Sequence, residues 1–164
     1  MEKINLFIPD PHAPSSYYIL YSLRKLCERI VIGIPKMNSY SGFFALSAKS
    51  RYVDKFYFTE DVRKSWDSGG NIEAENNYIG EILKICEKEN ITVLYPSWDP
   101  AVFIFSKYKD LFKEKGIDIP VPGFSCIRNI MDKYRLARMA EASGVSIPKT
   151  ALLNNSESAL EGVL

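Results

Sequence analysis

The strongest constraint on the fold is an alternation between short apolar runs and longer segments with helical spacing. The apolar runs cover residues 3–8, 30–34, 55–58, 92–95 and 117–121, and each has the length of a strand. Between most of them, apolar residues recur every three or four positions, as on one face of a helix. Strands that alternate with helices form parallel βαβ units. We therefore expect an α/β protein with a doubly wound parallel sheet in the strand order 3-2-1-4-5.

Local signals predict where the first two helices lie. The first follows two serines that can cap it, Ser15 and Ser16, and its apolar residues extend to Cys27. The second covers residues 72–88, where Ile72, Ile79, Ile82, Leu83 and Cys86 form one apolar stripe. Cys27 and Cys86 then lie on apolar helix faces, so we expect them to be buried, unreactive thiols.

Two further helices are expected in the second half of the chain. Asp99 is a candidate N-cap, with a proline directly behind it, for a helix over residues 99–116 that ends at a glycine. Asp132 is a candidate cap for a short helix that stops at Gly144. A strand entered through a proline is expected to follow, within residues 145–150.

Composition excludes several classes of protein. The 164 residues include 21 basic and 20 acidic side chains, a balance that does not indicate a nucleic-acid or anionic-membrane surface. No apolar run approaches the roughly 20 residues that span a bilayer, and the first residues do not resemble a signal peptide. We expect a cytoplasmic protein. The three cysteines lie far apart and His12 is the single histidine, so no zinc site is expected.

The expected strand order places a ligand site at the carboxyl ends of strands 1 and 4. Between these two strands the connections change direction, and ligands bind in the crevice at such a switch point. The loops that meet there cover residues 9–16 and 95–100, and both lead into a helix N-terminus that favours an anion. The candidate substrate-binding residues are Asp10, Ser15, Ser16 and Asp99. For each, a structural role is the alternative: a turn for Asp10 and helix capping for the others. His12 in the first loop is interpreted as a solvated side chain.

Several well-known motifs are absent from the sequence, and their absence limits the reactions that the chain is expected to catalyse. The first strand–helix turn has no Gly-x-Gly-x-x-Gly, which disfavours a nicotinamide-dependent enzyme, and neither a Walker A sequence nor a nucleophile elbow occurs. Lys133 is unusual, because a cation in the first turn of a helix is opposed by the helix dipole. A bound phosphate would remove this conflict. On spacing alone, the favoured interpretation is a surface lysine that tolerates this small penalty.

Several segments, in order, resemble ATP-grasp proteins of the carbamoyl-phosphate-synthetase-like carboxylate–amine ligase group. They are residues 50–55, the Leu-Tyr-Pro-Ser-Trp-Asp loop at 94–99, the Val-Pro at 121–122, the Met-Asp-Lys at 131–133 and the Gly-Val-Ser-Ile-Pro-Lys-Thr at 144–150. This similarity covers about two-thirds of the chain. The first loop differs from the family, because prolines and serines replace its usual glycines.

The resemblance implies a Rossmann-like pre-ATP-grasp domain, similar to the N-terminal domain of biotin carboxylase, over residues 1–127. Residues 128–164 would be the short α/β start of an ATP-grasp domain. Lys133 would hold ATP phosphates, and Asp10, Ser15, Ser16 and Asp99 would bind a carboxylate or amine substrate. The reaction would use ATP and Mg²⁺ to activate a carboxylate as an acyl phosphate for attack by an amine or similar nucleophile.

The resemblance further implies that the catalytic residues and magnesium ligands lie downstream of Leu164, so the 164-residue chain alone is expected to be inactive. The competing hypothesis is a non-enzymatic α/β metabolite-binding or regulatory module that holds a small molecule in the same crevice. Apolar residues near the end of the chain, such as Val145 and Leu152, could also support a homodimer.

Overall fold

The computed structural model describes residues 4–11, 14–36, 49–63 and 71–149. By contacts the chain forms two compact units, residues 1–124 and 125–164, and each is described by itself. The predicted domains, 1–127 and 128–164, stay a prediction, because a compact unit need not coincide with a functional domain.

The first unit is built on a parallel four-stranded sheet. Its strands are β1 (Ile4–Ile8), β2 (Cys27–Pro35), β3 (Lys55–Thr59) and β4 (Val93–Leu94), in the order β3-β2-β1-β4. The predicted order is confirmed for these four strands, and the chain has a Rossmann-like α/β fold. Beside β4, the expected fifth strand is reduced to a single parallel bridge between Val93 and Asp118. Pro120 has no N–H to extend the ladder there.

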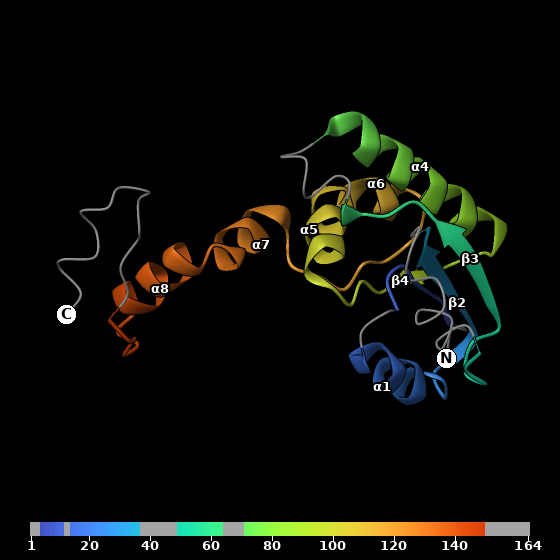
Figure 1. Cartoon of the computed structure of the whole chain (residues 1–164), viewed down its shortest axis with the longest axis horizontal. Helices are drawn as coiled ribbons and strands as arrows, with labels where there is room; N and C mark the ends of the chain where they lie inside the picture. The colour runs from blue at the N-terminus through green and yellow to red at the C-terminus, as the bar shows by residue number, and fades with distance from the viewer. Residues whose placement is uncertain (1–3, 12–13, 37–48, 64–70, 150–164) are drawn as a thin grey trace. The chain divides into compact units, whose positions relative to one another are not determined.

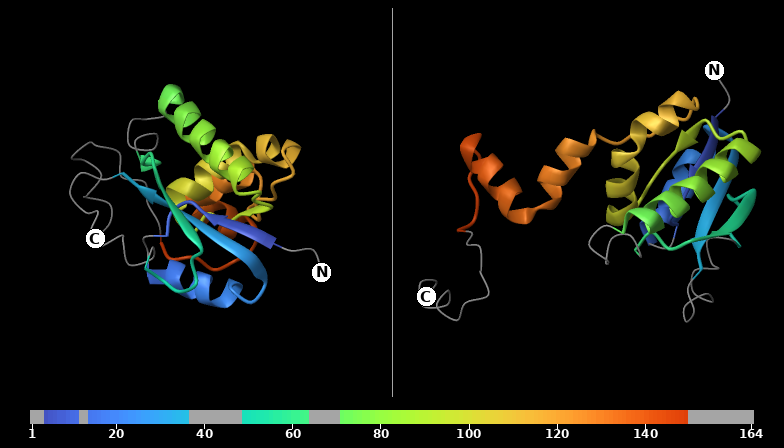
Figure 2. Two further views of the ribbon diagram at one scale, coloured as in Figure 1. Left: turned by 90° about the vertical axis from the view of Figure 1, so that its right-hand side faces the viewer. Right: turned by 90° about the horizontal axis from the view of Figure 1, so that it is seen from above.

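Helices cover both faces of the sheet (Figures 1 and 2). One face carries α1 (Pro14–Leu23), and the other carries α4 (Ile72–Lys88), α5 (Asp99–Lys107) and α6 (Lys109–Glu114). The alternation of side chains along the strands explains the two cores. Isoleucines at positions 30, 32 and 34 of β2 pack in the α1 core, which includes Leu20, whereas Val31 belongs to the core under the other helices.

The helix stop predicted at Gly116 is confirmed. Gly116 adopts a φ of 74°, and its N–H bonds the carbonyl of Lys113 while the N–H of Ile117 bonds that of Phe112. This pair of bonds is a Schellman motif. The end of α4 uses the same motif with Asn90 at a φ of 50° in place of glycine.

A matched pair of alanine substitutions tests this use of glycine. Gly116→Ala should lower the free energy of unfolding by about 1–2 kcal/mol, because a Cβ disfavours the left-handed conformation. Gly80, inside α4, has open space around its absent Cβ. Gly80→Ala should therefore raise the free energy of unfolding by about 0.5–1 kcal/mol. Urea denaturation measures both, and equal effects from the two substitutions would contradict the interpretation.

Several predicted boundaries are wrong. The helix expected over residues 99–116 is divided at Tyr108, whose hydroxyl reaches Glu75 and Asn76 of α4. Cys27 begins β2 and does not lie on a helix, because it pairs with Ile4 at the start of β1. It is only half-buried, whereas Cys86 is buried as expected.

Two further predictions about helix starts also fail. Ile72 does not join the apolar stripe of α4, because it is the first residue of the helix and is 63% exposed. Ser15 and Ser16 are the second and third residues of α1, which begins at Pro14, so they do not precede the helix as caps. Asn71 caps α4, accepting from the N–H groups of Glu73 and Ala74.

The second unit contains the predicted short helix. α8 (Lys133–Ala142) is capped by Asp132, and a Schellman motif at Gly144, with a φ of 76°, ends it. Another helix, α7 (Phe124–Met131), was not predicted and comes before it. The strand expected after Gly144 is absent from residues 145–149, and Thr150 lies outside the described residues. Among the helices of the described ranges, none has the length and apolar character to cross a membrane.

Candidate functional site

The loops after β1 and β4 meet at the carboxyl edge of the sheet, as the sequence predicts. Leu6 and Phe7 of β1 pair with Val93 and Leu94 of β4, so the residues that follow the two strands are neighbours. In a doubly wound sheet the crevice at this position is the general ligand site.

Three polar side chains from these loops and α1 form a connected cluster, which we call the Asp10 cluster: Asp10, Ser16 and Ser97. The Ser97 N–H donates to Asp10 Oδ1 at 3.1 Å, and the Ser97 hydroxyl lies 3.3 Å from the same oxygen. The hydroxyls of Ser16 and Ser97 are 3.2 Å apart. The fold therefore brings Asp10 and Ser16 together, with Ser97 as the link between them.

Asp10 is an unusual carboxyl group because it is 1% exposed and lacks an ionic partner in the described part of the chain. Among the described residues, its Oδ2 atom is buried without a hydrogen-bond partner. Burial raises the pKa of Asp10 to about 7, although hydrogen bonds from Ser97 act in the opposite direction. Near neutral pH this group can therefore either accept or donate a hydrogen bond, and strongly shifted carboxyl groups concentrate at functional sites.

The surroundings of the Asp10 cluster are tightly packed. A Cβ on Gly33 of β2 would lie 3.0 Å from the carbonyl oxygen of Pro9 and 3.2 Å from Thr59 Cγ2. Glycine at this position lets the loop that carries Asp10 pass close to the sheet. The hydroxyl oxygen of Thr59, at the end of β3, is also buried and has no hydrogen-bond partner within the described ranges.

A cation and an indole ring also lie among the segments that follow the strands. Arg63 binds the buried carboxylate of Asp61, with Nη2 to Oδ2 at 2.6 Å. Its guanidinium carbon is 5.9 Å from the centre of the Trp98 ring, within the range of a cation–π contact. Arg63 follows β3 and Trp98 follows β4, and no pattern in the sequence assigns a role to either.

Asp99 is not part of the hydrogen-bonded cluster in the described residues. Asp99 is exposed in the first turn of α5, and Trp98 occupies the N-cap position, so the prediction of Asp99 as N-cap is wrong by one residue. The helix begins one residue earlier than predicted because the carbonyl of Trp98 accepts its first bond, from the N–H of Val102 at 2.8 Å. Ser15 lies in α1, but its side chain is outside the described residues, as is His12.

Lys133 has the environment that its position in the sequence predicts. It is the first residue of α8 and is exposed, while Asp132 Oδ1 accepts from the N–H groups of Tyr134 and Arg135, each at 3.0 Å. Asp132 Oδ2 pairs with Arg135 at 3.3 Å. The Asp132 carboxylate is thus engaged, and the Lys133 ammonium forms no ion pair within the part of the chain that the structure describes. A lysine beside a helix N-terminus fits a phosphate group.

Side chains that could bind a metal ion do not form a cluster in the described residues. In the described ranges, no set of three or more His, Cys, Asp or Glu side chains is arranged to hold a metal ion. Lys133 and, from the Asp10 cluster, Asp10 and Ser16 stay predicted site residues.

Comparison with known proteins gives a structural similarity and no sequence family. No protein-family profile matches the chain, and no curated protein sequence matches it. Among solved structures, it is similar to the biotin carboxylase domain of a single-chain bacterial carboxylase, with a TM-score of 0.58 and 14% sequence identity. The similarity covers 96% of this chain and 33% of that one, so the chain spans about a third of that protein's length. At this identity the comparison shows the fold.

Proposed function

We propose that this chain is the N-terminal part of an ATP-dependent ligase of the ATP-grasp type. The observation that carries the proposal is the fold shared with a biotin carboxylase domain over almost the whole chain. The order of the sequence segments that resemble carboxylate–amine ligases supports it independently. The ligase would activate a carboxylate as an acyl phosphate and pass it to an amine or a similar nucleophile.

In this proposal the residues of the chain bind and orient ATP and the carboxylate or amine substrate. Lys133 and the first N–H groups of α8 hold phosphate oxygens of ATP. Asp10 and Ser16, joined by Ser97, bind the carboxylate or amine substrate, and Ser15 and Asp99 remain proposed contacts from the same two loops. Magnesium-bound ATP supplies the phosphoryl group. The electrostatic stabilisation of phosphoryl transfer would come from residues that follow this chain.

The reaction class can be tested by trapping the activated carboxylate. The ligase that contains this chain is incubated with ATP, Mg²⁺, hydroxylamine and a panel of small carboxylates. Hydroxylamine attacks an acyl phosphate to give a hydroxamate and free phosphate, so we expect ATP-dependent hydroxamate with at least one carboxylate. Binding of a metabolite with no ATP-dependent product from any of them would instead favour the non-enzymatic module.

Lys133→Ala tests the nucleotide site. We expect it to weaken ATP binding by about 1.5–3 kcal/mol, the range for a hydrogen bond to a charged group. This is roughly a 10- to 100-fold rise in the dissociation constant, measured by calorimetry on the ligase. Lys133→Arg should retain most of the affinity, and Lys84→Ala, an exposed lysine on α4, is the matched control. Unchanged ATP affinity in Lys133→Ala would remove this residue from the site.

A further inference from the structure

A cavity lies at the opposite edge of the sheet from the Asp10 cluster. It has a volume of about 310 Å³, at the lower end of the range for small-molecule sites. Ile91 comes just before β4, and Ile117 comes just before the bridge residue Asp118. These residues therefore mark the amino ends of the strands, whereas Asp10 and Ser97 follow the carboxyl ends. The cavity is separate from the proposed substrate site.

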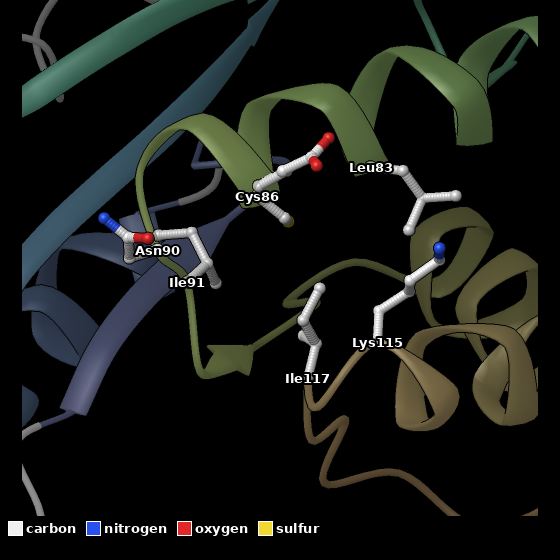
Figure 3. Close-up of a pocket in the computed structure, with 7 residues that line it drawn as sticks. Leu83, Cys86, Asn90, Ile91, Lys115 and Ile117 are labelled. Atoms are coloured by element: carbon white, nitrogen blue, oxygen red, sulfur yellow. The ribbon is translucent and has the colours of Figure 1, made fainter.

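The inner wall of this cavity is apolar. Figure 3 shows Leu83 and Cys86 of α4 on one side, Ile117 on the other and Ile91 beside them. Cys86, Ile91 and Ile117 are buried. Burial raises the pKa of the Cys86 thiol to about 12, so this group stays neutral and adds to the apolar wall. A branched or linear aliphatic group would complement it.

The rim of the cavity carries two opposite charges, Glu87 and Lys115. Glu87 and Lys115 both line the cavity and are exposed, and neither forms an ion pair within the residues that the structure describes. Lys115 extends toward α4 (Figure 3). Glu87 lies in the last turn of α4, which is the negative end of the helix dipole. One side of the rim thus favours an ammonium group and the other a carboxylate.

We propose that this cavity binds a small zwitterion with an aliphatic side chain, that is, an aliphatic α-amino acid. Its carboxylate would pair with Lys115, its ammonium with Glu87 and the end of α4, and its side chain would contact the apolar wall. The cavity volume equals that of about ten water molecules in the liquid, enough for a molecule of this size. This proposal does not depend on the ligase function.

The test is a set of titrations followed by two-dimensional NMR and calorimetry on the 164-residue chain. The probes are L-leucine, L-isoleucine, glycine, 4-methylpentanoate, which lacks the ammonium group, and 3-methylbutylamine, which lacks the carboxylate. We expect the two aliphatic amino acids to bind and to shift the amide signals of Cys86, Ile91 and Ile117. Each of the other three probes should bind at least about tenfold more weakly, the loss expected for one charged contact or for the apolar group.

Two variants test which residue binds each end of the ligand. Lys115→Gln should weaken leucine about tenfold or more without changing the affinity for 3-methylbutylamine, and Glu87→Gln should spare 4-methylpentanoate instead. Lys113→Gln, an exposed lysine on α6 outside the cavity lining, is the control. Absence of leucine and isoleucine binding to the wild-type chain, equal binding of 4-methylpentanoate, or unchanged leucine affinity in both cavity variants would each overturn the proposal.

Discussion

Asp10→Asn is expected to stabilise the protein at neutral and alkaline pH and to reduce the pH dependence of its stability. The pKa of Asp10 is raised from 3.8 to about 7 by burial, so the folded state holds a proton that the unfolded chain has lost over this interval. The contribution of this proton is complete below pH 3.8 and is lost as pH rises through about 7. The difference of about three pKa units corresponds to at most about 4 kcal/mol.

An asparagine avoids most of the free-energy cost of burying a charged carboxylate, because it carries no charge. Its carbonyl oxygen can still accept the Ser97 N–H. Urea denaturation of both proteins between pH 4 and 8 measures the effect. The stability advantage of the variant should grow with pH up to about 7 and then remain constant. Asp99→Asn, the same change at an exposed position, is the control. Parallel curves for wild type and Asp10→Asn would show that Asp10 titrates normally.

Measuring substrate binding by Asp10→Asn as well as its stability separates a functional role of this carboxyl group from a structural one. A buried carboxyl group that lowers stability at neutral pH is the kind of feature that persists for a functional reason. If the Asp10 cluster binds substrate as proposed, the more stable Asp10→Asn protein should bind that substrate more weakly. This combination would distinguish a functional carboxyl group from a purely structural one.

Phe105→Ala is expected to cause the largest loss of stability, about 3–5 kcal/mol. Phe105 lies on α5, is fully buried, and packs between Tyr78 and Phe112 with ring centres 5.9 Å and 5.5 Å away. Truncation would remove these contacts and leave a cavity between α4, α5 and α6. Because small domains are stable by only about 5–15 kcal/mol, the variant would be close to unfolding at 25 °C.

Two controls make this measurement interpretable. Phe56→Ala makes the same change at a position on β3 that is 44% exposed, and it should cost only about 1 kcal/mol. Phe105→Leu fills most of the space and should lose clearly less than Phe105→Ala. Thermal and urea unfolding should show the largest loss of stability for Phe105→Ala. A loss in Phe105→Ala no greater than in Phe56→Ala would show that the α5 core contributes little.

The parts of the fold that depend on residues close in sequence could be predicted. The four strands and the long helix follow from apolar runs and helical spacing, and the stops at Gly116 and Gly144 follow from a glycine after the last apolar turn. The meeting of the loops after β1 and β4 could also be predicted, because strand order in doubly wound sheets is restricted.

The side-chain contacts that join distant segments could not be predicted. Asp10 serves as the acceptor in front of α5 although 87 residues separate it from Ser97. Glu89 is another example, because Arg29 and Lys55 come to it from two different strands, at 2.6 and 2.7 Å. Burial alone would raise the pKa of Glu89, but hydrogen bonds from Lys55 and Tyr57 and the charge of Arg29 lower it. No local pattern in the sequence marks either set of partners.

The position of β1 in the sheet has a consequence for how the chain folds as it is made. β1 is the first strand in sequence but lies inside the sheet, and Asn5 bonds to Thr92, 87 residues later. A ribosome adding about 5–20 residues per second needs roughly 4–17 seconds to cover that distance. Throughout this interval one edge of β1 lacks its native neighbour, so the nascent chain exposes an apolar strand that chaperones can bind.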